Sequence, residues 1–479
     1  MTTDSHALQI LIDDALTIWA AGVEAVKPDR LIRDQTSLDG SWMTLADEEL
    51  DLSDYRRILV VGAGKASGAM AAALWQHRLS QVADRIRIDG WINAPEGSFR
   101  PGSAGPIHLH AARPAGINIP TPQAVAGTAE IIRRMQTAGP DTLCVVLLSG
   151  GGSAILVSPV EGIESADKQL IATAVASAGG NIEQLNTVRR ALSRVKGGGL
   201  LRGCRAARVV SLILSDVLGD PLETIASGPT VLGSSASPQA ALKVLDDLQL
   251  STDPRFVDIV RVLRARAAQS NSATRSASFP ADRINNLILA NNATAVDAAG
   301  VRAVELGYRY VMQSARASEG DVADLSLRCA DATLQVCRER EVDCWISGGE
   351  PTVKLPTRER CGIGGRNQQL ALLTGLRLHQ IMHSRTTIDD ESRTPFPYVF
   401  LSGGTDGEDG PTDAAGAWVT SETIDRALAV GLDPVEAAAR CDAYSFFHSL
   451  GNLIRSGPTG TNVCDLRIAL APSQRWLSF

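Results

Sequence analysis

The most constraining feature of this sequence is a recurring pattern in which a short apolar run is followed by small or acidic residues and then by a helix-like stretch. The pattern occurs at residues 58–65, 144–153, 209–216, 287–292, 344–350 and 398–406. Apolar runs without alternation are typical of strands buried on both faces, and the segments between them have helical periodicity. We therefore predict an α/β fold with mostly parallel, Rossmann-like sheets, whose polar turns line a ligand site at the carboxyl ends of the strands.

Two polar stretches interrupt this pattern. Residues 264–283 are repetitive and poor in large apolar side chains, which predicts a linker or a long surface loop. Residues 383–397 contain Asp389, Asp390, Glu391 and two prolines, which predicts a loop inserted before the strand near Tyr398. We accordingly expect an N-terminal α/β domain at residues 1–263 and a C-terminal α/β domain at residues 281–479, which face each other across a cleft.

Composition excludes several classes of function. The 479 residues carry a net charge of −7 and only 4% aromatic side chains, which argues against nucleic-acid binding. No apolar run approaches the ~20 residues of a membrane-spanning helix, and the N-terminus lacks a basic region followed by an apolar stretch. The eight cysteines form no CxxC pair. We expect reduced thiols and a cytoplasmic protein without membrane or nucleic-acid partners.

Glycine-rich turns follow the first two apolar runs. Residues 62–68 join a predicted strand to a predicted helix, so that backbone N–H groups near Gly64 and the charge of Lys65 are suited to an anion. The spacing is not that of a Walker A motif. The alternative is a close contact between helix and sheet, with Lys65 in solvent.

The second glycine-rich turn, Ser149-Gly-Gly-Gly-Ser153, lacks every Cβ that would keep a ligand from the backbone. Binding of phosphate or carboxylate fits it, and the alternative is a plain flexible turn. Ser149 is a poor candidate nucleophile, because the GxSxG elbow is absent. Residues 186–199 predict a helix that ends at glycines and carries Arg190 and Lys196. This basic face either meets an acidic ligand or is solvated, and Lys196 could instead compensate the helix dipole.

Acidic and amide side chains follow the later runs. Asp216 comes directly after a predicted buried strand, where a general base, a metal ligand or a helix N-cap is expected. Asn291 and Glu350 occupy similar positions. The metal candidates are Asp406, Glu408 and Asp409, whose carboxylates repel one another unless a cation is near. Hard oxygen ligands on a short loop suit Mg²⁺, and a solvated acidic turn is the alternative.

Arg366 opens a predicted helix, where the helix dipole disfavours a cation, so we infer a functional reason such as clamping of a phosphoryl group. Two histidine pairs are weaker candidates for a functional site. His379 and His383 are one helical turn apart, and His108 and His110 share a strand face. Neither pair has an obvious third ligand, so we do not expect them to bind a metal.

Nine motifs occur in an order that resembles the glycerate 2-kinase family with a MOFRL-type C-terminal domain. They are VGAGKA (61–66), LSGGGSA (148–154), NTVRRALSRVKGGG (186–199), LSDVLGDP (214–221), IASGPT (225–230), SGGEPTV (347–353), GGRNQQ (364–369), SGGTDGEDGPTDAAG (402–416) and GPTGTNV (457–463). The resemblance implies ATP-dependent phosphorylation of D-glycerate to 2-phosphoglycerate with Mg²⁺, on two α/β domains that face a cleft. It also implies that Lys65 and Arg366 are the principal catalytic cations and that Asp216 is their partner. Arg113 and Ala191 depart from the family, which often has histidine at both positions.

Together these observations predict a phosphotransferase in which Lys65, Arg366 and Mg²⁺ stabilise charge on the moving group. Asp216 is expected to orient or deprotonate the 2-hydroxyl. The residues expected to bind substrate or nucleotide are Gly64, Ser149, Gly150, Gly151, Gly152, Ser153, Arg190, Lys196, Asn291 and Glu350. Two alternatives remain: an NAD(P)H-dependent hydroxypyruvate reductase, although the dinucleotide fingerprint is incomplete, and a non-catalytic small-acid sensor. We expect a monomer or a homodimer.

Overall fold

A computed structural model describes residues 3–114, 119–233, 237–272, 279–339, 341–357, 359–384 and 396–472. The chain forms two compact units. Unit 1 comprises Met1–Arg30, Ser215–Gly219 and Ala290–Phe479, and unit 2 comprises Leu31–Leu214 and Asp220–Leu289. This division differs from the expected domains at residues 1–263 and 281–479, because the first helix and the turn after residue 214 both belong with the C-terminal half of the chain.

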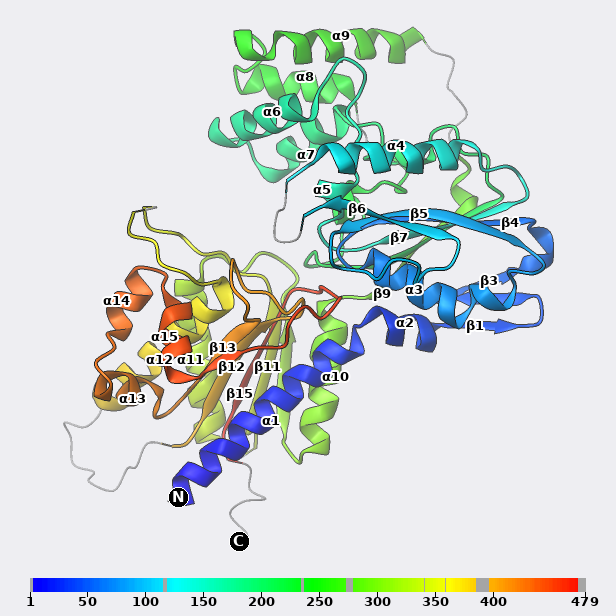
Figure 1. The fold of residues 1–479 in the computed structure, drawn as a ribbon. Helices are drawn as coiled ribbons and strands as arrows, with labels where there is room; N and C mark the ends of the chain where they lie inside the picture. Colours follow the sequence, from blue (N-terminus) through cyan, green and yellow to red (C-terminus); the bar gives the residue numbers. More distant parts are fainter. Residues whose placement is uncertain are drawn as a thin grey trace. The chain divides into compact units, whose positions relative to one another are not determined.

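Unit 2 is built on a six-stranded sheet (Figure 1). Its order is β6 (Ile107–Arg113), β5 (Arg87–Pro95), β4 (Arg57–Ala63), β7 (Thr142–Leu148), β8 (Arg208–Leu214) and β9 (Ile284–Ala290). The first five strands are parallel. Every residue of β7 is buried, as its unbroken apolar sequence predicts. In Figure 1, α3 (Ser67–His77) and α4 (Pro122–Gln136) lie on opposite faces of the sheet.

The remaining elements of unit 2 are helices and a small antiparallel sheet. The small sheet has β1 (Thr36–Asp39), β2 (Trp42–Leu45) and β3 (Glu48–Asp51), and it follows α2 (Pro28–Gln35). The helices are α5 (Gly152–Ile155), α6 (Ser165–Ser177), α7 (Ile182–Ala191), α8 (Pro238–Asp247) and α9 (Val257–Ser272). Four of them, α6 to α9, share a separate apolar core that includes Val188, Leu245 and Phe256.

Unit 1 has a six-stranded mixed sheet. Its order is β10 (Tyr310–Ser314), β11 (Cys344–Gly349), β15 (Asp465–Leu470), β12 (Val399–Gly404), β13 (Gly416–Thr420) and β14 (Leu453–Ile454). Strands β10 and β11 are parallel, whereas β15 is antiparallel to both β11 and β12. The α/β class is thus confirmed, while the expectation of mostly parallel pairing describes unit 2 better than unit 1.

Helices cover both faces of this sheet. One face carries α1 (Thr3–Ala25) and α10 (Asn292–Glu305), and the other carries α11 (Val322–Arg338) and α12 (Arg366–Ser384) (Figure 1). A Cβ at Gly22 of α1 would lie 2.8 Å from the carbonyl oxygen of Ala295, so glycine permits the close packing of α1 on α10. The short helices α13 (Thr423–Ala429), α14 (Pro434–Ala439) and α15 (Ala443–Leu450) pack near α12.

Two sequence predictions were wrong. The expected linker at 264–283 is helical as far as Ser272, because α9 continues through the alanine- and arginine-rich stretch, which has high helix propensity. Residues 273–278 of this stretch lie outside the described residues. The expected basic helix over 186–199 ends at Ala191. Ser193 interrupts it, because its hydroxyl accepts hydrogen bonds from the N–H groups of Val195 and Lys196. The predicted loop at 383–397 lies mostly outside the described residues.

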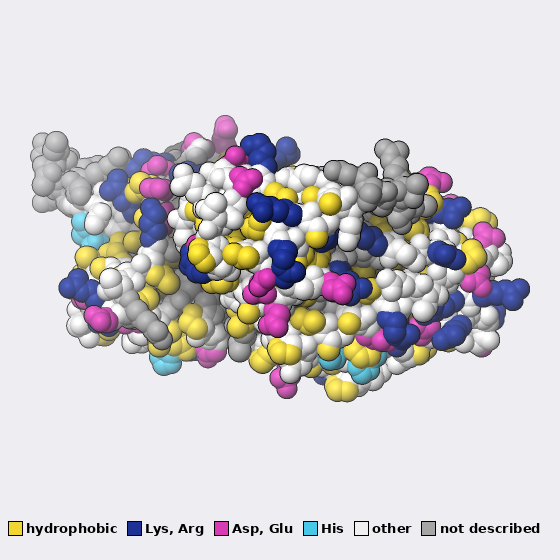
Figure 2. Space-filling view, turned by 90° about the horizontal axis from the view of Figure 1, so that it is seen from above, with side chains coloured by type: hydrophobic (Ala, Val, Ile, Leu, Met, Phe, Trp, Pro, Cys, Tyr) yellow, Lys and Arg dark blue, Asp and Glu magenta, His cyan; other side chains and the backbone are white. Residues whose placement is uncertain are grey.

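Charged side chains do not segregate by sign on the molecular face drawn in Figure 2. Lys and Arg side chains there are scattered among acidic, apolar and uncharged ones. None of the helices in the described part of the chain has the length and hydropathy of a membrane span.

Candidate active-site residues

The Lys65 turn of unit 2 joins β4 to α3, as predicted. Gly64 has φ +152°, and a Cβ there would lie 2.1 Å from Ser149 Oγ, so the turn requires glycine. The backbone N–H of Lys65 donates to the carbonyl of Gly150 (2.8 Å), which joins the two predicted glycine-rich turns. Ser149 is 1% exposed, and its hydroxyl accepts a hydrogen bond from the N–H of Ala66 (2.9 Å). Its geometry is that of a residue that fixes the turn.

Two cationic side chains flank the second glycine-rich turn. Gly151 has φ +73°, and a Cβ built there would lie 3.5 Å from Lys65 Cγ and 3.4 Å from Arg113 Nη2. Arg113, at the end of β6, is 4% exposed. The side chains of two cationic residues thus lie near Gly151, which suits an anionic ligand. Arg113 was noted from the sequence only as a departure from the family.

Lys196 is buried in unit 2, with only 3% of its surface exposed. Its Nζ donates to Ser227 Oγ (3.1 Å), and that hydroxyl hydrogen-bonds Ser153 Oγ (2.9 Å). Burial and the nearby Arg189, Lys168 and Arg190 lower the pKa of Lys196 well below its usual value. Lys196 thus reaches the end of the second glycine-rich turn, although not from a helix. Arg190, on α7, donates from Nε to the carbonyl of Asn186 (3.3 Å).

Arg366 of unit 1 is the first residue of α12, as predicted, and its guanidinium lies among carboxylates. Asp465, at the start of β15 and fully buried, accepts from Nε and Nη2 (2.7 and 2.9 Å). Glu350 accepts from Nη1 (2.8 Å). Burial opposes the charge of Arg366, but Asp465 and Glu350 outweigh it and raise its pKa. Two acids thus stabilise the charge of Arg366 at a helix start, where the helix dipole disfavours a cation. The sequence analysis identified only one of them, Glu350.

Asp216 belongs to unit 1 and lies close to this network. The amide of Asn462 donates to Asp216 Oδ2 (3.5 Å), and Cys464 Sγ donates to its backbone carbonyl (3.1 Å). The same sulfur lies 3.9 Å from Glu350 Oε2. The structure therefore brings together the predicted residues Asp216, Glu350 and Arg366, which are far apart in the sequence. Lys65, the other predicted catalytic cation, lies in unit 2.

The predicted metal ligands do not converge on one point. Asp409 is 2% exposed and accepts hydrogen bonds from the N–H groups of Asn367 and Gln368 (3.0 and 2.8 Å), so it caps the start of α12. Burial raises its pKa to about 7, although these two N–H groups oppose the shift. Asp406 accepts from the backbone N–H of Glu408 (3.2 Å). Asp409 is the member of this set whose position has a clear structural reason.

Two other sequence candidates have structural partners. Asn291 caps α10 by accepting from the N–H of Thr294 (3.1 Å). His379 and His383, which had no third ligand in the sequence, have one in the fold. One ring nitrogen of each and an oxygen of Asp425 on α13 lie within 4.8 Å of one another. All eight cysteines are free thiols.

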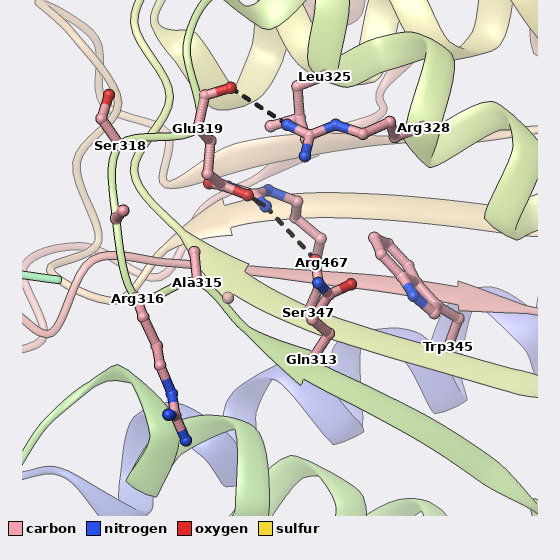
Figure 3. A pocket seen from close by; sticks show the side chains of 12 residues that line it. Gln313, Ala315, Arg316, Ser318, Glu319, Leu325, Arg328, Trp345, Ser347 and Arg467 are labelled. Atoms are coloured by element: carbon pink, nitrogen blue, oxygen red, sulfur yellow. Dashed lines mark hydrogen bonds and ion pairs between the residues drawn. The ribbon is translucent and has the colours of Figure 1, made fainter. Parts of the chain in front are cut away.

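A cavity of about 210 Å³ in unit 1 lies against the ends of β10 and β11 and the start of α11. Figure 3 shows Glu319 directed at Arg467, with which it forms a two-point ion pair (2.9 and 2.6 Å). The carbonyl of Glu319 accepts from Arg328 (3.1 Å). Arg467 is two residues beyond Asp465 on β15, so both face the same side of the sheet. The sequence did not identify this pair, because neither residue lies in a glycine-rich turn.

Fold and site define a two-unit α/β protein with a cationic glycine-rich turn in one unit and an arginine held by carboxylates in the other. Residues 14–262 match a domain of unknown function (DUF4147), and residues 343–465 match the MOFRL family. The chain is 34% identical to glycerate kinase from Danio rerio, over 96% of this chain and 97% of that protein. It is also 34% identical, over 86% of this chain and 99% of the relative, to an Agrobacterium vitis protein that bears a provisional name as a hydroxypyruvate reductase.

The crystal structure of glycerate kinase from Thermotoga maritima has the same fold, with a TM-score of 0.77 and 29% identity over 97% of this chain and all of that one. The chain belongs to the glycerate 2-kinase family, and it is therefore a kinase.

Proposed function

We propose that the protein transfers the terminal phosphoryl group of ATP to the 2-hydroxyl of D-glycerate, which yields 2-phosphoglycerate and ADP. The observation that carries the proposal is the near full-length similarity to glycerate kinases. The Lys65 turn and the Arg366 network support it, because phosphoryl transfer depends mainly on positioning and on stabilising charge. The partial dinucleotide fingerprint gives the reductase alternative little support.

The proposed roles follow from the contacts within each unit. Lys65 and Arg113, beside Gly151, bind and neutralise phosphoryl oxygens. Arg366 presents a guanidinium whose orientation Asp465 fixes. Asp216 orients the 2-hydroxyl or accepts its proton. The proposal requires Lys65 and Arg366 to act on the same pair of substrates, and a ligand-bound structure in which either side chain fails to contact them would contradict it.

Unit 1 offers carboxylates for a magnesium ion, although those of Asp216, Glu350 and Asp406 form no three-ligand cluster among the described residues. Asp216, Glu350 and Asp406 offer the hard carboxylate oxygens that Mg²⁺ prefers, whereas Asp409 already uses both of its oxygens at the start of α12. When bound, Mg²⁺ would neutralise charge on the phosphate oxygens of the nucleotide. We place the protein in the cytoplasm, since eight free thiols suit a reducing compartment, and we expect a monomer or a homodimer.

The decisive experiment identifies the product by phosphorus NMR after incubation with ATP, Mg²⁺ and D-glycerate. We expect 2-phosphoglycerate and glycerate-dependent release of ADP. Oxidation of NADH or NADPH by hydroxypyruvate would favour the reductase instead, and calorimetric binding of glycerate without turnover would favour a sensor.

Side-chain roles are tested with Lys65→Ala and Arg366→Ala. Each should lower kcat/KM at least about tenfold, which corresponds to about 1.4 kcal/mol of lost transition-state stabilisation. Lys243→Ala is the control, because Lys243 is an exposed lysine of unit 2 that pairs with Asp247. Activity near the wild-type level in both variants would refute the assigned roles.

A further inference from the structure

A second cavity, of about 180 Å³, lies within unit 2. Its walls come from α6, α7, Ile119 and Pro120, and from the segment that follows the second glycine-rich turn. The lining residues are Ile119, Pro120, Ser153, Val157, Ser165, Lys168, Gln169, Ala172, Leu185, Arg189 and Lys196. None of them is acidic, whereas three are cationic.

The three cations of this cavity have no acidic counterpart. Lys168, Arg189 and Lys196 form no ion pair with a carboxylate among the described residues, and the charges that act on the two lysines are other cations. Burial, and then Arg189, lowers the pKa of Lys168 to about 8. Burial also lowers the pKa of Arg189. Lys196 is buried, and Lys168 and Arg189 are half-buried. Gathering three like charges around one cavity is unfavourable, so this arrangement calls for an anionic ligand that restores neutrality.

The chemical composition of the lining restricts the class of anion. The same lining also contains the apolar side chains of Ile119, Pro120, Val157 and Leu185. Glycerate has one negative charge and no apolar group, so it matches neither the three cations nor the apolar residues of the lining. A nucleoside polyphosphate has several negative charges together with a sugar and a ring that bury apolar surface. Ser153, which lines the cavity, directly follows Gly152, and the carbonyl of Gly150 in the same turn accepts a hydrogen bond from the N–H of Lys65.

We propose that this cavity binds the nucleotide, with the polyphosphate against Lys168, Arg189 and Lys196 and the adjoining sugar against the apolar residues of the lining. The inference rests on the proposed function, and it places the binding site of the phosphoryl donor, ATP, in unit 2. The terminal phosphate then extends past Ser153 toward Gly151, where Lys65 and Arg113 lie. Lys168 is a new binding residue, and no glycine-rich motif marks it.

The test is titration calorimetry with ADP and AMP on the full chain. Lys168→Ala and Arg189→Ala should each weaken ADP binding at least tenfold, while Lys168→Arg, which keeps the charge, should stay within threefold of wild type. AMP binding should change less than ADP binding, because AMP lacks the second phosphate. Lys243→Ala is the matched control and should bind ADP as wild type does. Lys168→Met replaces Lys168→Ala if circular dichroism shows that the alanine variant is not folded.

Two results would overturn the inference. One is ADP binding at wild-type strength in folded Lys168→Ala and Arg189→Ala proteins. The other is a raised KM for glycerate in these variants with an unchanged Kd for ADP, since the cavity would then hold the acid substrate. If ADP binding depends on Lys168 but the wild-type protein makes no 2-phosphoglycerate, the nucleotide site stands and the proposed function fails.

Discussion

The pairing of Arg366 with Asp465 offers a quantitative test of how the guanidinium of Arg366 is held. Asp465 is fully buried and accepts two hydrogen bonds from the guanidinium, whereas the side chain of Arg366 is one-third exposed and keeps Glu350 as a second partner. Removal of one member of a buried pair costs about 3–5 kcal/mol, and we take the lower part of that range because of the exposure. Asp465→Ala and Arg366→Ala should therefore each destabilise unit 1 by about 3 kcal/mol.

The double variant should lose about 4 kcal/mol of stability, less than the sum of about 6 kcal/mol for the two single variants, because neither charge is then left without its partner. The difference of about 2 kcal/mol is the coupling energy of the pair. Urea dependence of hydrogen exchange at the amides of β15 assigns the free energy to unit 1. Asp465→Ala should also lower kcat, since Asp465 acts as a positioning residue for Arg366. Single effects that add to within about 0.5 kcal/mol would refute the reasoning.

Three further perturbations test the other parts of the site. Gly64→Ala should destabilise the protein by about 1–3 kcal/mol through backbone strain and should also displace Lys65, because the new Cβ meets Ser149. The control is Gly97→Ala, since φ at Gly97 is +78° but the surrounding space is open. Equal loss of activity in both variants would contradict the steric argument. Asp216→Asn should reduce kcat at least about tenfold with little change in ATP binding, and an unchanged pH–rate profile would remove Asp216 as the base. Asp406→Asn should raise the Mg²⁺ concentration needed for half-maximal activity, and an unaltered Mg²⁺ titration would discard Asp406 as a ligand.

The sequence predicted the strands that have unbroken apolar runs, most of which are buried, although β9 at the sheet edge is only partly buried. Strands β4, β7, β8, β9, β11 and β12 were all anticipated. Strand β5 was not, since Asp89, Gly90 and Pro95 interrupt its apolar pattern. Gly90 is needed there because a Cβ would lie 2.1 Å from the carbonyl oxygen of Val60 on the neighbouring strand. That requirement arises from pairing with a distant strand and leaves no local signal.

The division into units was also beyond local sequence reasoning. Composition placed the boundary in the polar stretch at 264–283, yet α1 packs with α10 and β15 of the C-terminal half. The same holds for Ser215–Gly219, which follows a strand of unit 2 but belongs to unit 1. Asp216 thereby lies beside Cys464 and Asn462, residues that are about half the chain away.

Motifs pointed to the two cations that we propose to be catalytic, but not to the side chains that hold or assist them. Lys65 and Arg366 stand out because glycines and helix starts flank them, and these are local features. Asp465 is a single acid before an apolar strand, and Lys168 reads as an ordinary helical lysine. Their importance comes from what surrounds them: a buried guanidinium for Asp465, and two other cations without a carboxylate for Lys168. Buried charge balance is a property of tertiary structure, so an excess of one sign in a cavity indicates a ligand that the sequence does not record.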